Sequence, residues 1–227
     1  MGEKMASIDY ITENFLTLEK LATLSKVPVE QLREMMAANC LPGPAYEVTG
    51  HYTVRSIFGE HQETVCRAYY PKSHVVKAQA IAANSDGYSK QNAALRQAFY
   101  RDYKKILVTK KAVDFGLEHL FDEAGQVKGD AADKLLASEW QHYLDGTYGL
   151  CTRGASVEEI AMKETMIAKI IYLTDLLDQE KSQSLVDDLR CAVDALDAVS
   201  APFGPHEVAS SSRGRYIDAV REKYFET

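Results

Sequence analysis

The chain has 227 residues, of which 46% are hydrophobic and 26% charged, with a formal net charge of −7. This length allows one large domain or two small ones, and the acidic balance argues against a general nucleic-acid binder. No apolar run approaches the roughly 20 residues that a membrane-spanning helix needs, and the N-terminus lacks a secretory signal pattern, so we expect no membrane partner. The four cysteines form no CxxC motif, which predicts reduced thiols and a cytoplasmic location.

Residues 17–39 predict two short helices joined by a tight turn. Thr17 is placed to cap the first helix, and Pro28 stands at the first position of the second, where its missing N–H costs nothing. Asn39 and the CLPGP that follows it end the second helix.

A hairpin or wing is predicted next, because YEVTGHYTVRSIF has β-branched and aromatic residues around Thr49 and Gly50. A helix restarts after it, with Pro71 near its first turn. This order resembles the DNA-binding domain of MerR-type regulators, on the residues LTLEKLATLSKVPVEQLREMMAANCLPGP and YYPKSHVVKAQAI. Residues 1–85, about a third of the chain, are therefore expected to form a winged helix-turn-helix-like domain.

The remaining residues, 86–227, contain a series of amphipathic segments and predict a helical bundle domain, so the expected fold class is mainly α. Segment 90–111 carries a surplus of Lys and Arg. That surplus would suit DNA, an acidic partner or an acidic surface of the same chain, and the alternative is a solvated helix face. Ser156 to Glu159 form a capping box that opens a long helix.

DNA binding is an alternative that the charges do not favour. In a MerR-like arrangement the second helix would enter the major groove, and Gln31 and Arg33 would read bases. Glu30 and Glu34 on the same exposed side would repel phosphates, and residues 1–85 contain eight basic and nine acidic side chains. The other interpretation is a scaffold used for packing, dimerisation or ligand contact.

The loop TYGLCTRGA is the first part of a candidate ligand site. It carries Tyr148, Cys151 and Arg153 between glycines, which permit a close approach to a ligand. Tyr148 and Arg153 are candidate substrate-binding residues. Cys151 is a candidate nucleophile or pocket-lining residue, although an isolated cysteine is more often a small buried apolar side chain.

The closing stretch APFGPHEVASSSRGRYIDAVREKYF is the second part. Ser211 would cap the last helix, and with Arg213, Arg215 and the free backbone N–H groups it would form an anion-binding corner. His206 is a candidate general base, with Glu207 beside it as a further catalytic candidate. The alternative is a structural corner in which the arginines bind acidic side chains such as Asp194 or Asp197.

The whole chain also resembles an uncharacterised bacterial family associated with natural-product biosynthesis, on YLDGTYGLCTR and PHEVASSSRGRYIDAVREKY. We therefore expect an enzyme or enzyme-like ligand-binding protein that acts on a carboxylate- or phosphate-bearing small molecule. The alternative is a MerR-like, ligand-responsive transcription regulator. Histidine spacing predicts no metal site, the cofactor is left open, and so is a homodimer.

Overall fold

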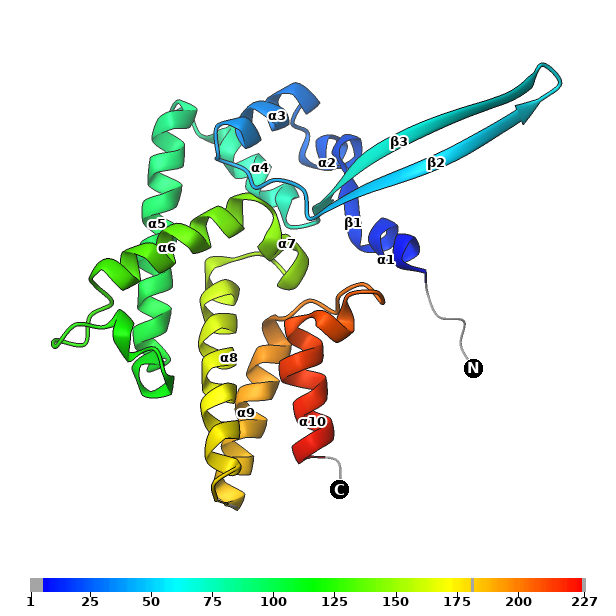
Figure 1. The fold of residues 1–227 in the computed structure, drawn as a ribbon. Coiled ribbons are helices and arrows are strands. Elements are labelled where there is room, and N and C mark those ends of the chain that lie inside the picture. Colours follow the sequence, from blue (N-terminus) through cyan, green and yellow to red (C-terminus); the bar gives the residue numbers. More distant parts are fainter. Residues whose placement is uncertain (1–5, 181, 226–227) are drawn as a thin grey trace.

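The computed structural model describes residues 6–180 and 182–225 (Figure 1). The N-terminal part consists, in order, of α1 (Ser7–Asn14), β1 (Phe15–Thr17), α2 (Leu18–Ser25), α3 (Val29–Ala37), β2 (Tyr46–Ser56), β3 (Gly59–Pro71) and α4 (His74–Ala83). The rest consists of α5 (Tyr88–Thr109), η1 (Ala112–Phe115), η2 (Glu118–Leu120), α6 (Asp130–Leu144), α7 (Thr147–Cys151), α8 (Val157–Leu177), α9 (Gln183–Val199), η3 (Val208–Ser210), η4 (Gly214–Asp218) and α10 (Ala219–Tyr224).

The two short helices α2 and α3 form as predicted. The Thr17 side chain caps α2 by accepting a hydrogen bond from the backbone N–H of Lys20 at 3.4 Å. Lys26 adopts the left-handed conformation at the end of α2, with φ of 59°, and so makes the tight turn. Pro28 is the N-cap of α3, one residue before the predicted position.

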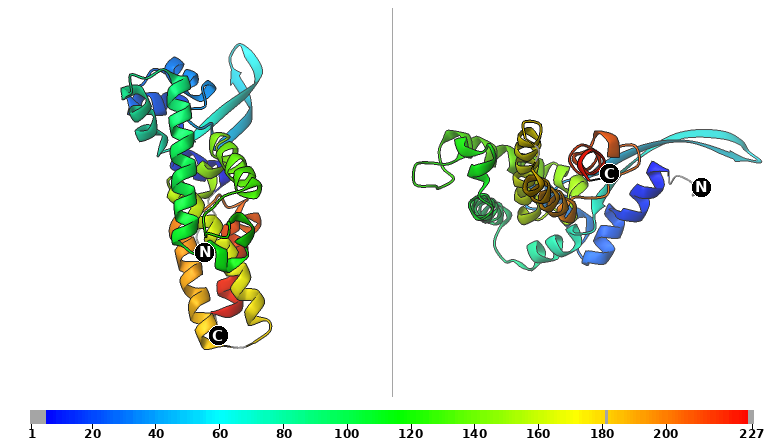
Figure 2. Two further views of the ribbon diagram at one scale, coloured as in Figure 1. Left: turned by 90° about the vertical axis from the view of Figure 1, so that its left-hand side faces the viewer. Right: turned by 90° about the horizontal axis from the view of Figure 1, so that it is seen from below.

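The predicted fold class, a mainly α chain with a winged helix-turn-helix-like unit followed by a helical bundle, is wrong. The N-terminal part contains a three-stranded antiparallel sheet in the order β1-β3-β2. Eleven residue pairs join β2 to β3, and this long hairpin projects away from the rest of the molecule (Figures 1 and 2).

The error comes from the position of the turn. Thr49 and Gly50 lie in the middle of β2, and the chain reverses at Ile57 and Phe58. The ring of Tyr52 lies over Gly50, because a Cβ built there would be 2.8 Å from the ring edge. The aromatic ring covers the glycine and lets the strand continue through it, which the local turn signal did not reveal.

The helices that follow lie close to their predicted positions. Ser156 and Glu159 form the capping box at the start of α8, with reciprocal backbone bonds at 3.2 Å. Helices α8, α9 and α10 run side by side in each view (Figures 1 and 2) and share one apolar core. Residues 147–151, predicted as loop, form the short helix α7.

Contacts across the predicted boundary at residue 85 are direct. The backbone N–H of Gly43 donates to the carbonyl of Leu144 at 2.8 Å, and Lys77 Nζ donates to the carbonyl of Ala155 at 2.7 Å. Helix α7 also touches β3. The hairpin and α4 are thereby held against the helices that follow.

Candidate functional site

The arginine-rich corner predicted at the end of the chain is centred on an internal carboxylate. Asp197 of α9 accepts hydrogen bonds from Arg213 and, at 2.7 Å, from Arg221. Arg221 also donates to Asp194 at 2.8 Å, and Arg213 donates to the carbonyl of Ala201 at 3.0 Å. Burial alone would raise the pKa of Asp197, but these arginines hold it below its usual range. Arg213 is therefore engaged within the protein, which is the arrangement that the sequence left as the alternative.

His206 and Glu207 lie beside that corner, against the base of the hairpin. Glu207 accepts a hydrogen bond from Tyr46 Oη of β2 at 2.6 Å and another from the backbone N–H of Gly204 at 3.2 Å. His206 Nε2 is half-exposed and 3.7 Å from Glu207 Oε1. Burial, and then the bond to Glu207, raise the pKa of Tyr46. The proton thus stays on the tyrosine, and Glu207 fastens the C-terminal segment to the sheet.

The two remaining residues of the predicted corner have different surroundings. Ser211 Oγ donates to the carbonyl of Val208 at 2.8 Å and accepts from the backbone N–H of Gly214 at 3.2 Å, as a helix-capping residue does. Arg215 is exposed, and its guanidinium lies 5.7 Å from the ring centroid of Tyr216. Ser211 is accounted for by local structure, while Arg215 faces solvent.

Tyr148 and Cys151 belong to a group of buried polar side chains between α5, α6, α7 and α8. Tyr148 Oη donates to Glu139, and Cys151 lies beside Lys163. We call the set the buried polar group; its members are the buried Tyr103, Glu139, Tyr148, Cys151 and Lys163, and the half-buried Glu164 beside them. Sequence reasoning missed the members on long helices, since a single polar residue on an amphipathic helix carries no signal of its own.

The electrostatics of the buried polar group keep its protons in place. Burial raises the pKa of the Cys151 thiol, and Lys163 offsets this only in part. Burial and the adjacent Glu139 raise the pKa of Tyr148. Cys151 therefore remains a thiol and Tyr148 a hydrogen-bond donor, whereas a nucleophilic cysteine needs the thiolate.

The structure does bring the two predicted parts of the site next to each other. The backbone N–H of Arg153 donates to the carbonyl of Val199 at 3.1 Å, and that of Ala201 donates to the carbonyl of Cys151 at 3.3 Å. Arg153 also reaches the carbonyl of Asp197 at 3.2 Å. The two segments form one packed junction in which most polar groups already have protein partners.

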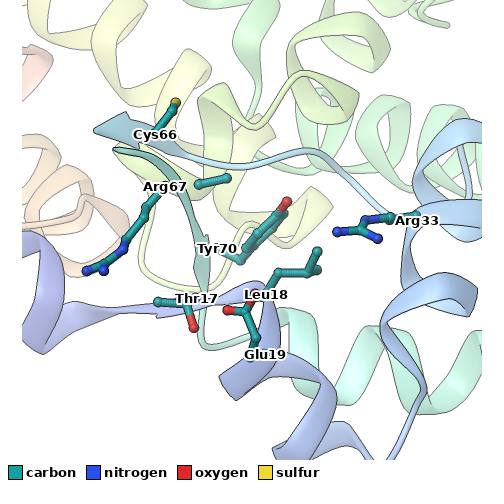
Figure 3. Close-up of a pocket in the computed structure, with 8 residues that line it drawn as sticks. Thr17, Leu18, Glu19, Arg33, Cys66, Arg67 and Tyr70 are labelled. Carbon is teal, nitrogen blue, oxygen red and sulfur yellow. The ribbon is translucent and has the colours of Figure 1, made fainter. Parts of the chain in front are cut away.

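A separate cavity lies in the N-terminal part, beside β3. It has a volume of about 550 Å³ and is lined by Thr17, Leu18, Glu19, Arg33, Cys66, Arg67, Ala68 and Tyr70. Figure 3 shows Arg33 and Arg67 on opposite sides of Tyr70, with Glu19 between them. We call it the arginine cavity. Arg33, predicted as a base-reading residue, lines it, while Gln31 on the same helix is half-buried.

The two guanidinium groups of the arginine cavity are free to bind a ligand. Within residues 6–180 and 182–225, neither Arg33 nor Arg67 has a carboxylate within ion-pair distance. The pKa of Glu19 is lowered first by its own backbone N–H, then by the Thr17 hydroxyl, and both arginines add to this. Two cations and one carboxylate thus line a solvent-open hollow, and the charge of Glu47, outside the lining, also acts on Tyr70.

The described residues contain neither a cluster of metal-ligand side chains nor a helix that could span a membrane. In that part of the chain no three or more His, Cys, Asp and Glu side chains gather as metal ligands would. None of the helices seen there combines the length and the apolar character needed to cross a bilayer.

Comparison with known proteins places the chain in a family. The model of a family of unknown function, DUF6058, matches residues 95–225, which is more than half of the chain. The chain belongs to this family. No curated protein and no solved structure matches it.

Proposed function

We propose that the chain is an enzyme-like binding protein for an anionic small molecule, held in the arginine cavity. The observation that carries the proposal is the pair of guanidinium groups, Arg33 and Arg67, on the wall of one hollow, neither of which has an ion-pair partner among the described residues. Guanidinium groups form strong, directional hydrogen bonds with carboxylate and phosphate oxygens. The volume of about 550 Å³ lies within the range of small-molecule sites.

The other polar lining groups suit a ligand with both anionic and hydroxyl groups. Glu19 stays ionised, because its pKa is lowered, and can accept hydrogen bonds from hydroxyl or amine groups of a ligand. Burial raises the pKa of Tyr70 and keeps its hydroxyl protonated as a donor. With two arginines and one carboxylate on its wall, the cavity favours a ligand that presents a single carboxylate or phosphate group to the arginines.

The setting of this activity rests on the sequence alone: the family resemblance suggests the pathway, and the cysteine usage suggests the compartment. The proposed ligand is an intermediate of a natural-product pathway, and the proposed location is the cytoplasm. The alternative function is DNA binding of the MerR type, in which Gln31 and Arg33 would contact the duplex. The position of Arg33 on the cavity wall favours the small molecule.

Binding of defined anions tests the proposal. Calorimetric titration of the full chain with inorganic phosphate, pyrophosphate and succinate should show binding of at least one of them. Replacing Arg33 or Arg67 with Gln removes one charge-assisted hydrogen bond, which should weaken that binding by about ten- to a hundredfold. Arg96→Gln, at an exposed site on α5, is the matched control and should bind as the wild type does.

Two results would refute the proposal. One is the lack of any measurable binding of these anions; the other is equal affinity in the two cavity variants and the control. Gel shifts with duplex DNA over a range of salt concentrations test the DNA-binding alternative, because phosphate contacts weaken steeply as salt rises. A salt-sensitive shift that Gln31→Ala abolishes, together with unchanged anion binding in Arg33→Gln, would favour DNA.

A further inference from the structure

The outer part of the β2–β3 hairpin contacts nothing else among the described residues. The side chains from Tyr52 to Thr64 are all exposed, and the tip residues Ile57 and Phe58 are 94% and 93% exposed. An isolated two-stranded ribbon is marginally stable in water. A hairpin of this length with an apolar tip therefore needs a partner.

One face of the hairpin continues the protein core outward. Near its base, Tyr46, Val48 and Tyr69 pack with the side chains of α1 and β1. The same face continues along β2 with Tyr52 and Val54, which are 47% and 51% exposed. Successive side chains of a strand alternate between faces, so these residues form a single stripe whose outer half is uncovered.

The free hydrogen-bonding groups lie along β2. This strand is at the edge of the sheet, since β3 is in the middle. Ser56 and Gly59 close a two-residue turn and thus form a hydrogen-bonded pair. By alternation, the even-numbered residues of β2 bond to β3. The backbone N–H and C=O groups of the odd-numbered residues, from Glu47 to Arg55, point away from it.

The sequence of this edge is self-complementary. In EVTGHYTVR, residues 47–55, an antiparallel pairing of two copies centred on His51 places Glu47 opposite Arg55. It also places Val48 opposite Val54, Thr49 opposite Thr53, and Gly50 opposite Tyr52. Each of these is a favourable cross-strand pair, and the last repeats the cover that Tyr52 gives Gly50 within one chain.

This register also matches the direction of the free backbone groups. It places odd-numbered residues opposite odd-numbered residues, so all the outward N–H and C=O groups from Glu47 to Arg55 find partners. Slipping one copy by two residues would separate Glu47 from Arg55 and Val48 from Val54. In the centred register, Ser56 lies opposite Tyr46, so the apolar tip reaches the base of the other hairpin.

We infer that a second copy of this chain pairs with it along β2, in an antiparallel arrangement centred on His51, to form a continuous sheet across the dimer. The opposite charges of Glu47 and Arg55 occur twice in this symmetric interface. Residues 46–71 contain three acidic and two basic side chains, which gives nucleic acid no charge-based advantage as the occupant. The inference is independent of the ligand proposed for the arginine cavity.

Proline substitutions on the two edges of the hairpin test the inference. Thr53 and Gln62 are directly paired across β2 and β3, and both have outward N–H groups, on opposite edges. Proline removes an N–H, so Thr53→Pro should block pairing through β2, while Gln62→Pro is the matched control. In sedimentation velocity the wild type and Gln62→Pro should have twice the 25.3 kDa mass of one chain, and Thr53→Pro should be a monomer.

Disulfide trapping tests the register without weakening the fold. Opposite residues of a hydrogen-bonded antiparallel pair have Cα atoms about 5.5 Å apart, a distance that a disulfide spans. With the exposed Cys66 and Cys191 replaced by Ser, His51→Cys should therefore form covalent dimers under mild oxidation. Thr53→Cys should not, because its own counterpart is four residues out of register.

A charge variant is the third test of the proposed dimer interface. Glu47→Lys places like charges opposite each other at two symmetric positions and should raise the dimer dissociation constant by about tenfold. Glu63→Lys, on the other strand of the hairpin, should leave it unchanged. A wild-type monomer at high concentration, a dimer that survives Thr53→Pro, or equal trapping at residues 51 and 53 would each overturn the inference.

Discussion

Replacement of His74 by leucine should remove a pH dependence of stability that the wild-type chain carries. His74 begins α4 and is 1% exposed, and neither ring nitrogen has a hydrogen-bond partner among the described residues. Its ring packs edge-on against Tyr70, with centroids 6.2 Å apart. Burial, together with the positive charge of Lys77 nearby, lowers the pKa of His74 to about 3.

The size of the effect follows from the difference between the folded and unfolded pKa. The unfolded imidazole, with a pKa of 6.5, takes up a proton in the range where the folded one does not. The folded state is therefore progressively disfavoured as the pH falls from 6.5 toward 3, by about 1.4 kcal/mol for each pH unit. Two units below 6.5, the cost is about 2.7 kcal/mol. Leucine has no proton to take up and loses this dependence.

Guanidinium denaturation at about pH 7 and about pH 4.5 measures the difference. The free energy of unfolding should fall more for the wild type than for His74→Leu, by about 2.5 kcal/mol, while carboxylate titration affects both chains alike. His119→Leu, at an exposed position, is the matched control. If the wild type and His74→Leu lose the same stability on acidification, the buried imidazole is protonated in the folded state and the reasoning fails.

Two further substitutions test the packing of the helices. Asp197→Asn removes the charge at the centre of the arginine corner and should lower the free energy of unfolding by about 2–3 kcal/mol. The more exposed Asp194→Asn should cost less than about 1 kcal/mol in denaturant titrations. Because the folded pKa of Asp197 lies below its usual value of 3.8, the cost of Asp197→Asn should persist down to that value and disappear only as the pH falls through the lowered folded pKa. Gly146→Ala should cost more than Gly116→Ala in the same assay. Both glycines have positive φ, 91° and 81°, but only the first would press a Cβ onto the backbone of Pro44.

Local signals in the sequence located the helices well because their ends depend on neighbouring residues. Thr17 caps α2, and Ser156 with Glu159 caps α8, through bonds that span three residues. The same reasoning placed the turn of the hairpin at the wrong residues. Its true turn has the apolar residues Ile57 and Phe58 at its two central positions, between Ser56 and Gly59, and Gly50 supplied a false mark inside the strand.

The candidate sites depended on contacts that sequence spacing does not contain. The sequence offered two interpretations for the arginines at the end of the chain, and the choice between ligand and Asp197 required the position of α9. Arg33 and Arg67 come from a helix and a strand, so nothing in the linear order placed them on one cavity. The pairing of Tyr46 with Glu207 joins residues even farther apart.

The family match covers some of the features described above and leaves out others. The matched segment, residues 95–225, contains the buried polar group and the arginine corner, whereas the arginine cavity and the hairpin lie before it. A property shared through that segment would rest on the buried polar group or on the arginine corner. The protonated Cys151 and Tyr148 suit a structural role, as does the pairing of Arg213 with Asp197. Ligand binding and pairing along β2 depend instead on residues outside the match. Relatives that share only the matched segment are therefore expected to keep the helical core and to lack both.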